Sequence, residues 1–176
     1  DRPEGGLAAA GTAVASVEGI GEVFVLPNVG NKSEYSELVL QARSLSRKTF
    51  DQRFYLRDLL GSKHLTLLVS ETAVAGKAFL GYCLCDNMVH HGAVWIDHLA
   101  IRKEARRKGL GKQLIRWAGM WALGGGCEAL RLSALPSAVP FYRSLGFQML
   151  GSKDRDNMDK MELKLERARE LLWGRQ

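Results

Sequence analysis

Two glycines lie one residue apart in the stretch RRKGLGKQLIRW, residues 106–117, after a basic run and before an apolar helical pattern. Glycine weakens a helix, but it lets another group approach the backbone closely and adopts left-handed angles without strain. The first N–H groups of a helix have no partner within that helix, so a helix start favours anions. Gly109 and Gly111 therefore predict a turn that admits an anionic group.

Basic charge gathers around the same turn. The 176-residue chain carries a formal net charge of +6, and the window 102–116 alone reaches that value, because seven basic residues face only Glu104. Such a local excess indicates an anionic partner. A run of solvated charges is the plainer alternative. A basic nucleic-acid-binding domain is a further one, although the window lacks interleaved aromatic residues and any standard recognition motif.

Two common phosphate-binding motifs do not fit the turn. A P-loop requires glycine at position 106 and serine or threonine at position 113, where the chain has Arg106 and Gln113. A dinucleotide-binding fingerprint requires a third glycine at position 114, which is Leu114. The remaining pattern is a strand, a basic turn with Arg106-x-x-Gly109-x-Gly111, and a helix.

The elements that position this turn follow from hydrophobic periodicity and from glycine and proline. Strands are expected at 22–28, 64–72, 78–86, 93–101 and 128–135, and a closing hairpin is expected from FQMLGS to 160–165. Helices are expected at about 33–45, 50–60, 111–123, 138–145 and after 165, and a turn at 74–77. This order predicts a mixed sheet with helices on both faces.

Length and composition predict one domain with a small arm. Residues 1–21 are rich in Gly and Ala without a clear period, so they are expected to form an irregular arm. Residues 22–165 are expected to form the domain and residues 166–176 a terminal helix. No stretch approaches the roughly 18 apolar residues of a membrane-spanning helix, and no membrane partner is expected.

The cysteines and histidines predict neither a disulfide framework nor a metal site. Cys83, Cys85 and Cys127 are odd in number and lack CxxC spacing, so buried reduced thiols are expected. Such thiols are typical of an intracellular protein. The expected compartment is the cytoplasm, or an organelle if a transit segment has been removed.

The pattern at 106–111 resembles the pyrophosphate loop of the GNAT superfamily of N-acetyltransferases, Q/R-x-x-G-x-G/A. The segment AVPFYRSLGF (138–147) is similar to the second landmark of that superfamily, a short helix that carries Phe-Tyr and closes with Gly-Phe. KMELKL (160–165) resembles its last strand. The resemblance covers about residues 65–165 and implies an α/β (α+β) fold with a mixed, mostly antiparallel central sheet flanked by helices on both faces.

The resemblance implies acetyl-CoA as the cofactor. Backbone groups of Leu99 and Ile101 would then pair with the amides of the pantetheine arm. The expected cofactor-binding residues are Leu99, Ala100, Ile101, Arg106, Arg107, Lys108, Gly109, Leu110, Gly111 and Lys112. One departure concerns Leu135, since many members of the superfamily have asparagine seven residues before the tyrosine.

Three residues are candidates for the chemistry. Tyr142 matches the tyrosine that serves the leaving thiolate in many members, and a core tyrosine is the alternative. Asp97 is the candidate base, because acids and histidines at this position often face the cleft in the superfamily; a buried structural aspartate is the alternative. His98 points to the other face of the strand and is a second candidate, and either residue could act through a water.

These residues together imply an acetyl-CoA-dependent N-acetyltransferase, in which the acceptor amine attacks the thioester directly without a covalent enzyme intermediate. A coenzyme A-binding module of the same fold without catalysis is the first alternative, and the basic nucleic-acid-binding domain is the second. The sequence leaves open whether the acceptor is a protein lysine, an N-terminal amine or a small amine, and whether the protein is a homodimer.

Overall fold

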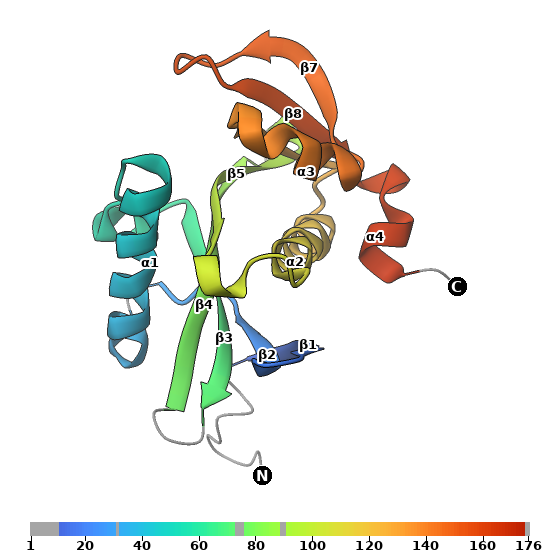
Figure 1. Cartoon of the computed structure of the whole chain (residues 1–176). Helices are drawn as coiled ribbons and strands as arrows, with labels where there is room; N and C mark the ends of the chain where they lie inside the picture. Colours follow the sequence, from blue (N-terminus) through green and yellow to red (C-terminus); the bar gives the residue numbers. More distant parts are fainter. Residues whose placement is uncertain (1–10, 31, 73–75, 89–90, 175–176) are drawn as a thin grey trace. The chain divides into compact units, whose positions relative to one another are not determined.

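The computed structural model describes residues 11–30, 32–72, 76–88 and 91–174 (Figure 1). The chain forms two compact units. The first unit contains the chain up to Leu84 together with His98–Leu114, and the second contains Cys85–Asp97 together with the chain from Ile115 onward. The boundary therefore falls within three elements, which are the strands β4 (Gly76–Met88) and β5 (Ala93–Ile101) and the helix α2 (Leu110–Gly124).

The first unit contains the helix α1 (Ser36–Phe50) and the strands β1 (Thr12–Val17), β2 (Gly21–Leu26) and β3 (Lys63–Thr72), together with most of β4. Short 3-10 turns are present at Ser33–Tyr35, Leu56–Leu60 and Lys103–Ala105. The apolar face of α1, which includes Leu38, Ala42 and Leu45, packs in one buried cluster with residues of β2, β3 and β4. This packing is what fixes α1 against the sheet.

The second unit contains β6 (Ala129–Ala134), α3 (Val139–Ser144), β7 (Gln148–Lys153), β8 (Asp159–Lys164) and α4 (Arg169–Trp173), with 3-10 turns at Pro136–Ala138 and Leu165–Arg167. Helix α2 packs closely on α4 at Gly119, where an added Cβ would lie 2.6 Å from Leu172 Cδ2. Arg116 Nε also donates a hydrogen bond of 2.8 Å to Leu172 O. The closing hairpin predicted from the sequence is confirmed as β7 and β8.

The eight strands lie in the order β1-β2-β3-β4-β5-β6-β8-β7. The pairs β1–β2, β2–β3, β6–β8 and β7–β8 are antiparallel, and β5–β6 is parallel. The helix α2 connects the two parallel strands, as a crossover between parallel strands requires. The expected mixed, mostly antiparallel sheet flanked by helices is confirmed.

The structure corrects three predicted elements near the N-terminus. Part of the expected irregular arm, Thr12–Val17, is a strand paired antiparallel with β2, whereas residues 1–10 lie outside the described residues. The predicted helix 33–45 runs on to Phe50 and ends at Asp51, which adopts a left-handed φ of 56°. The predicted second helix over 50–60 is therefore only a 3-10 turn at Leu56–Leu60. The predicted turn at 74–77 lies largely outside the described residues.

Gly81 allows β4 and β5 to approach closely, and its replacement gives a prediction about stability. An added Cβ at Gly81 would lie 2.6 Å from the Ala100 carbonyl oxygen and 2.6 Å from Ile101 Cδ1. We expect Gly81→Ala to lower the free energy of unfolding by about 2 kcal/mol. The new methyl group would overlap the Ala100 carbonyl oxygen, which is a backbone atom and cannot move aside. Urea unfolding measures the change.

Gly124→Ala is the matched control for this prediction. Gly124 is the last residue of α2, and an added Cβ there would meet no atom within 4 Å. The control is expected to leave stability unchanged or to raise it slightly, since alanine favours helix. Equal effects of the two substitutions would contradict the assigned contact between β4 and β5.

Candidate active site

The turn between β5 and α2 has the geometry of an anion-binding turn. Arg107 has a φ of 62° and Gly109 a φ of 74°, so the chain reverses through two left-handed residues. Gly111 instead lies in the first turn of α2 and is helical. The expectation of left-handed angles therefore holds for Gly109 and is wrong for Gly111, whereas the left-handed Arg107 was not anticipated from the sequence.

The start of α2 presents backbone N–H groups at this turn. Gln113 N donates to Gly109 O over 3.2 Å, which is the first hydrogen bond of the helix. The N–H groups of Leu110, Gly111 and Lys112 precede that bond, so they have no acceptor within the helix. An added Cβ at Gly109 would meet no atom within 4 Å. The position that a Cβ of Gly109 would occupy is thus open, and the dipole of α2 favours an anion near it.

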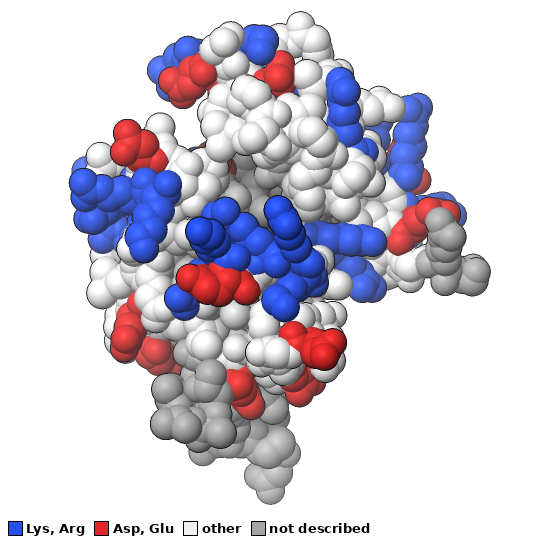
Figure 2. Space-filling view, viewed as in Figure 1, with Lys and Arg blue, Asp and Glu red and all other residues white. Residues whose placement is uncertain are grey.

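Exposed basic side chains surround the same turn. Arg106, Arg107, Lys108 and Lys112 are all exposed. Figure 2 shows Lys and Arg side chains gathered on one face, over the segment between β5 and α2. The acidic residue of this segment, Glu104, has a pKa held below its usual range by a hydrogen bond from its own backbone N–H and by nearby cations. The local field is therefore positive.

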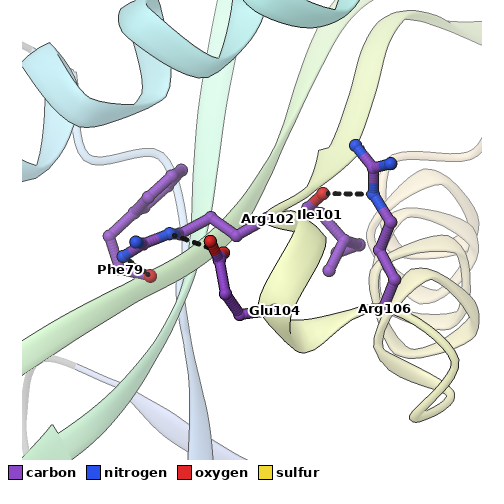
Figure 3. Close-up of polar contacts among 5 residues, drawn as sticks. All are labelled: Phe79, Ile101, Arg102, Glu104 and Arg106. Carbon is purple, nitrogen blue, oxygen red and sulfur yellow. Dashed lines mark hydrogen bonds and ion pairs between the residues drawn. The ribbon is translucent and has the colours of Figure 1, made fainter.

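Two arginines form hydrogen bonds with backbone carbonyl groups near the end of β5 (Figure 3). Arg106 Nε donates to Ile101 O over 3.0 Å, which leaves the terminal amino groups of Arg106 for other partners. Arg102 Nη1 donates to Phe79 O over 3.4 Å, and its Nε lies 3.6 Å from Glu104 Oε2. The Arg102–Glu104 pair is exposed on both sides, at 46% and 74%, so it contributes little to stability.

The second half of β5 directs backbone groups away from β4. Arg102 N donates to Leu80 O over 2.8 Å, so this N–H points toward β4. Because backbone groups alternate between the two edges of a strand, those of Leu99 and Ile101 point to the opposite edge. Among the described residues, the parallel ladder with β6 ends at the pair of Ile96 and Leu132. Leu99 and Ile101 thus lie beyond the last paired residue of the edge that faces β6.

The two candidate bases differ in their surroundings. Asp97 is exposed, so the alternative of a buried structural aspartate is wrong. His98 is half-buried and stacks on Phe50 with 4.5 Å between ring centroids. Burial, with a smaller effect of Lys63, lowers the pKa of His98 to about 4. At neutral pH the His98 ring is therefore uncharged.

Tyr142 lies in the short helix α3 and is buried, with 8% of its surface exposed. Phe141 and Phe147 flank its ring edge-on at centroid distances of 5.1 and 5.4 Å. Phe147 N donates to Tyr142 O over 3.1 Å, and Gly146 supplies a φ of 99° for the reversal. The Phe-Tyr helix that closes with Gly-Phe is thus present as the sequence predicts.

The candidates are distributed over both units. His98, Leu99, Ala100, Ile101 and the turn from Arg106 to Lys112 belong to the first unit, and Asp97 and Tyr142 to the second. The first unit adds three residues that sequence reasoning missed, Ser46, Phe50 and Tyr82, which contact His98. They come from α1 and β4, and no spacing along the chain links them to β5.

Other polar clusters have structural explanations. Asp154 Oδ1 accepts hydrogen bonds from Asp156 N and Met158 N over 2.8 and 2.9 Å, so this acid stabilises the β7–β8 loop. Cys83, Cys85 and Cys127 are buried free thiols, as predicted. The described residues contain no group of three or more His, Cys, Asp and Glu that could hold a metal. None of their helices has the length and apolar character to cross a membrane.

Comparison with known proteins agrees with this geometry. The acetyltransferase (GNAT) domain family matches residues 63–149, which contain β3 to β6, the anion-binding turn and Tyr142. Glucosamine 6-phosphate N-acetyltransferase 1 of Oryza sativa subsp. japonica is 27% identical over 106 residues, covering 58% of this chain. That match spans 64% of the rice protein, less than two thirds of its length.

Solved structures share the fold. Gcn5 of Tetrahymena has a TM-score of 0.63 at 12% identity, covering 79% of this chain and 94% of that chain. The NatC complex bound to Gag peptide and CoA has a TM-score of 0.63 at 15% identity, covering 80% of this chain and 98% of that chain. The fold is that of a GNAT acetyltransferase domain. The family model and the rice relative support membership of the GNAT superfamily.

Proposed function

We propose that the protein is an acetyl-CoA-dependent N-acetyltransferase that transfers the acetyl group directly to a primary amine. The observation that carries this proposal is the turn from Arg106 to Lys112, with its open glycine, its helix-start N–H groups and its exposed cations. These features fit the pyrophosphate of coenzyme A. The backbone of Leu99 and Ile101 fits the amides of the pantetheine arm.

Each residue of the site has an assigned task. Acetyl-CoA supplies the acetyl group as a thioester, whose carbonyl carbon the amine nitrogen attacks while the carbon–sulfur bond breaks. The N–H of Leu99 stabilises the negative charge that develops on the carbonyl oxygen. Asp97, or a water that it holds, takes the proton of the attacking amine, and Tyr142 donates a proton to the departing sulfur. No cysteine is assigned a covalent role.

The relatives suggest which amines to test. The rice relative is named for glucosamine 6-phosphate, and the NatC complex holds a peptide. A phosphorylated amino sugar, a peptide N-terminus, a lysine side chain and a polyamine therefore form the panel.

The proposal predicts acetylation that depends on both the amine and the protein. Acetyl-CoA carrying a labelled acetyl group is incubated with the protein and each amine, and mass spectrometry follows the label. We expect the label on the nitrogen of at least one amine, with one free thiol released for each acetyl group transferred. A melting temperature raised by acetyl-CoA without any transfer would favour the binding module. A melting temperature raised by RNA or DNA alone would favour the nucleic-acid-binding domain.

A further inference from the structure

The hydrogen bonds of Ser46 bear on where the proton of the His98 ring lies. Ser46 is fully buried on α1. Its Oγ donates a hydrogen bond of 2.7 Å to the carbonyl oxygen of Gln52, which can only accept. Because a serine hydroxyl has one proton, Ser46 Oγ must accept in every other hydrogen bond that it makes.

Two hydroxyl groups contact His98 Nδ1. His98 Nδ1 lies 3.3 Å from Ser46 Oγ. His98 Nδ1 also lies 3.4 Å from the Tyr82 hydroxyl. Both contacts are attractive when Nδ1 carries a proton, because Ser46 Oγ has already donated its own proton to Gln52 O and the Tyr82 oxygen can also accept. An unprotonated Nδ1 would instead set its lone pair against that of Ser46 Oγ.

The remaining nitrogen of the ring is therefore a hydrogen-bond acceptor. A neutral imidazole with its proton on Nδ1 has a lone pair on Nε2. Within the described part of the chain, Nε2 of His98 has no hydrogen-bond partner. This atom is also not fully buried. Nε2 of His98 is therefore accessible to solvent.

The packing around the ring keeps it uncharged and fixed in orientation. Phe50 stacks on one face at an interplanar angle of 13°, and Tyr82 lies edge-on at 80°. The titratable groups that act on His98 are Lys63 of β3, whose charge disfavours a second positive charge, and Tyr82 of β4, whose pKa burial raises. Neither group supplies a negative charge that would favour protonation of His98.

We propose that Nε2 of His98 accepts a hydrogen bond from the attacking amine of the acceptor and so orients the nitrogen lone pair toward the thioester. His98 is thereby an amine-binding residue and not the base that takes the proton. Ser46 is a positioning residue, because it holds the ring in the tautomer that leaves Nε2 free to accept. This inference rests on the proposed transferase function and identifies the group that binds its acceptor.

The position of His98 in β5 supports this assignment. His98 directly precedes Leu99, whose N–H is assigned to the carbonyl oxygen of the thioester. Successive side chains of a strand point to opposite faces, so His98 and Leu99 present different faces of β5. The two nitrogen atoms that would contact the reacting groups thus come from neighbouring residues of one strand.

The tautomer can be measured without knowledge of the acceptor. Long-range proton–nitrogen NMR spectra of protein labelled at histidine distinguish the two neutral tautomers, and His98→Asn assigns the signals of His98. We expect a neutral ring with its proton on Nδ1 from neutral pH down to about pH 5, with protonation near pH 4. In Ser46→Ala we expect the proton to move to Nε2. A wild-type ring with its proton on Nε2 would overturn the inference.

Two variants test the binding of the amine once the panel supplies an acceptor. The amide nitrogen of His98→Asn takes the place of Nδ1 and still donates to Ser46, but nothing replaces Nε2. We expect the KM for the amine to rise about tenfold, because the loss of one hydrogen bond weakens binding by about that factor. The KM for acetyl-CoA should stay unchanged. In His98→Gln the side-chain oxygen takes the place of Nε2, and part of the lost affinity should return.

The outcomes separate this inference from the proposed function. If wild type acetylates an amine and His98→Asn keeps the wild-type KM for that amine, the inference is wrong and the transferase stands. A fall in kcat confined to low pH, with an unchanged KM, would assign His98 to proton removal and would also overturn it. If wild type acetylates no amine while it binds acetyl-CoA, the proposed function fails, and the inference fails with it.

Discussion

Tyr142→Phe is expected to lower kcat about 100-fold while leaving the affinity for acetyl-CoA nearly unchanged. A general acid contributes a factor of roughly 10² to 10⁴ to a rate, and this substitution removes only the phenolic hydroxyl. The ring of Tyr142 packs between Phe141 and Phe147, and phenylalanine preserves both edge-on contacts. The helix α3 should therefore remain folded in the variant. The measurement is kcat and KM against pH with an acceptor from the panel.

Asp97→Asn is the contrasting variant for the other end of the reaction. Asp97 is exposed, so the substitution should leave stability almost unchanged. Its rate deficit should be largest at low pH, where the acceptor amine is mostly protonated, and should shrink as pH rises. The deficit of Tyr142→Phe should persist over the same range. Full activity of Tyr142→Phe would show that the Tyr142 side chain packs in the core without a role in the reaction. Full activity of Asp97→Asn would show that the Asp97 carboxylate takes no part in the reaction.

Gly111→Glu is expected to weaken acetyl-CoA binding about 100-fold or more. The new carboxylate would lie in the first turn of α2, beside the N–H groups assigned to the pyrophosphate, and would repel it. At a ligand concentration 100 times the wild-type Kd, binding stabilises wild type by about 2.7 kcal/mol, and a 100-fold weaker Kd leaves about 0.4 kcal/mol. Thermal unfolding with and without acetyl-CoA measures the difference.

The fold of Gly111→Glu should survive the substitution. Gly111 has helical angles, and a carboxylate near a helix N-terminus is stabilising by about 0.3–1 kcal/mol. Gly111→Gln has nearly the same size without the charge, so it separates repulsion from steric exclusion. Gly111→Ala should keep most of the affinity. An undiminished thermal shift in a folded Gly111→Glu protein would remove the pyrophosphate from this turn.

The sequence predicts well those features that depend on neighbouring residues. The strand β5, the basic turn and the start of α2 follow one another within about 20 residues, and each has a local cause in apolar alternation, glycine or helical spacing. The strand bounds 93–101 agree with the structure. The sequence allowed left-handed angles at both Gly109 and Gly111, and only Gly109 adopts one. Gly111 is helical, and the sequence pattern does not distinguish a glycine of the turn from one in the first turn of the helix.

Elements that depend on distant residues were predicted less well. The strand β1 lies at the edge of the sheet and none of its residues is fully buried, so it has no clear apolar alternation. Its pairing with β2 defines it. The apolar spacing of Phe50 and Phe54 suggested a second helix, but Asp51 ends α1 between them. The surroundings of His98 are the clearest case. Ser46 is 52 residues away in the chain, and only the packing of α1 on the sheet brings it to Nδ1.

The most direct test of the account is to follow the backbone amides of the turn during titration with acetyl-CoA. Proton–nitrogen spectra of the uniformly labelled protein resolve the N–H groups of Leu110, Gly111 and Lys112 individually. If the pyrophosphate binds at the start of α2, these three signals should shift most, together with those of Leu99 and Ile101, and inorganic pyrophosphate should reproduce only the first set. Saturable acetyl-CoA binding that leaves the three amides of α2 unshifted would contradict the account.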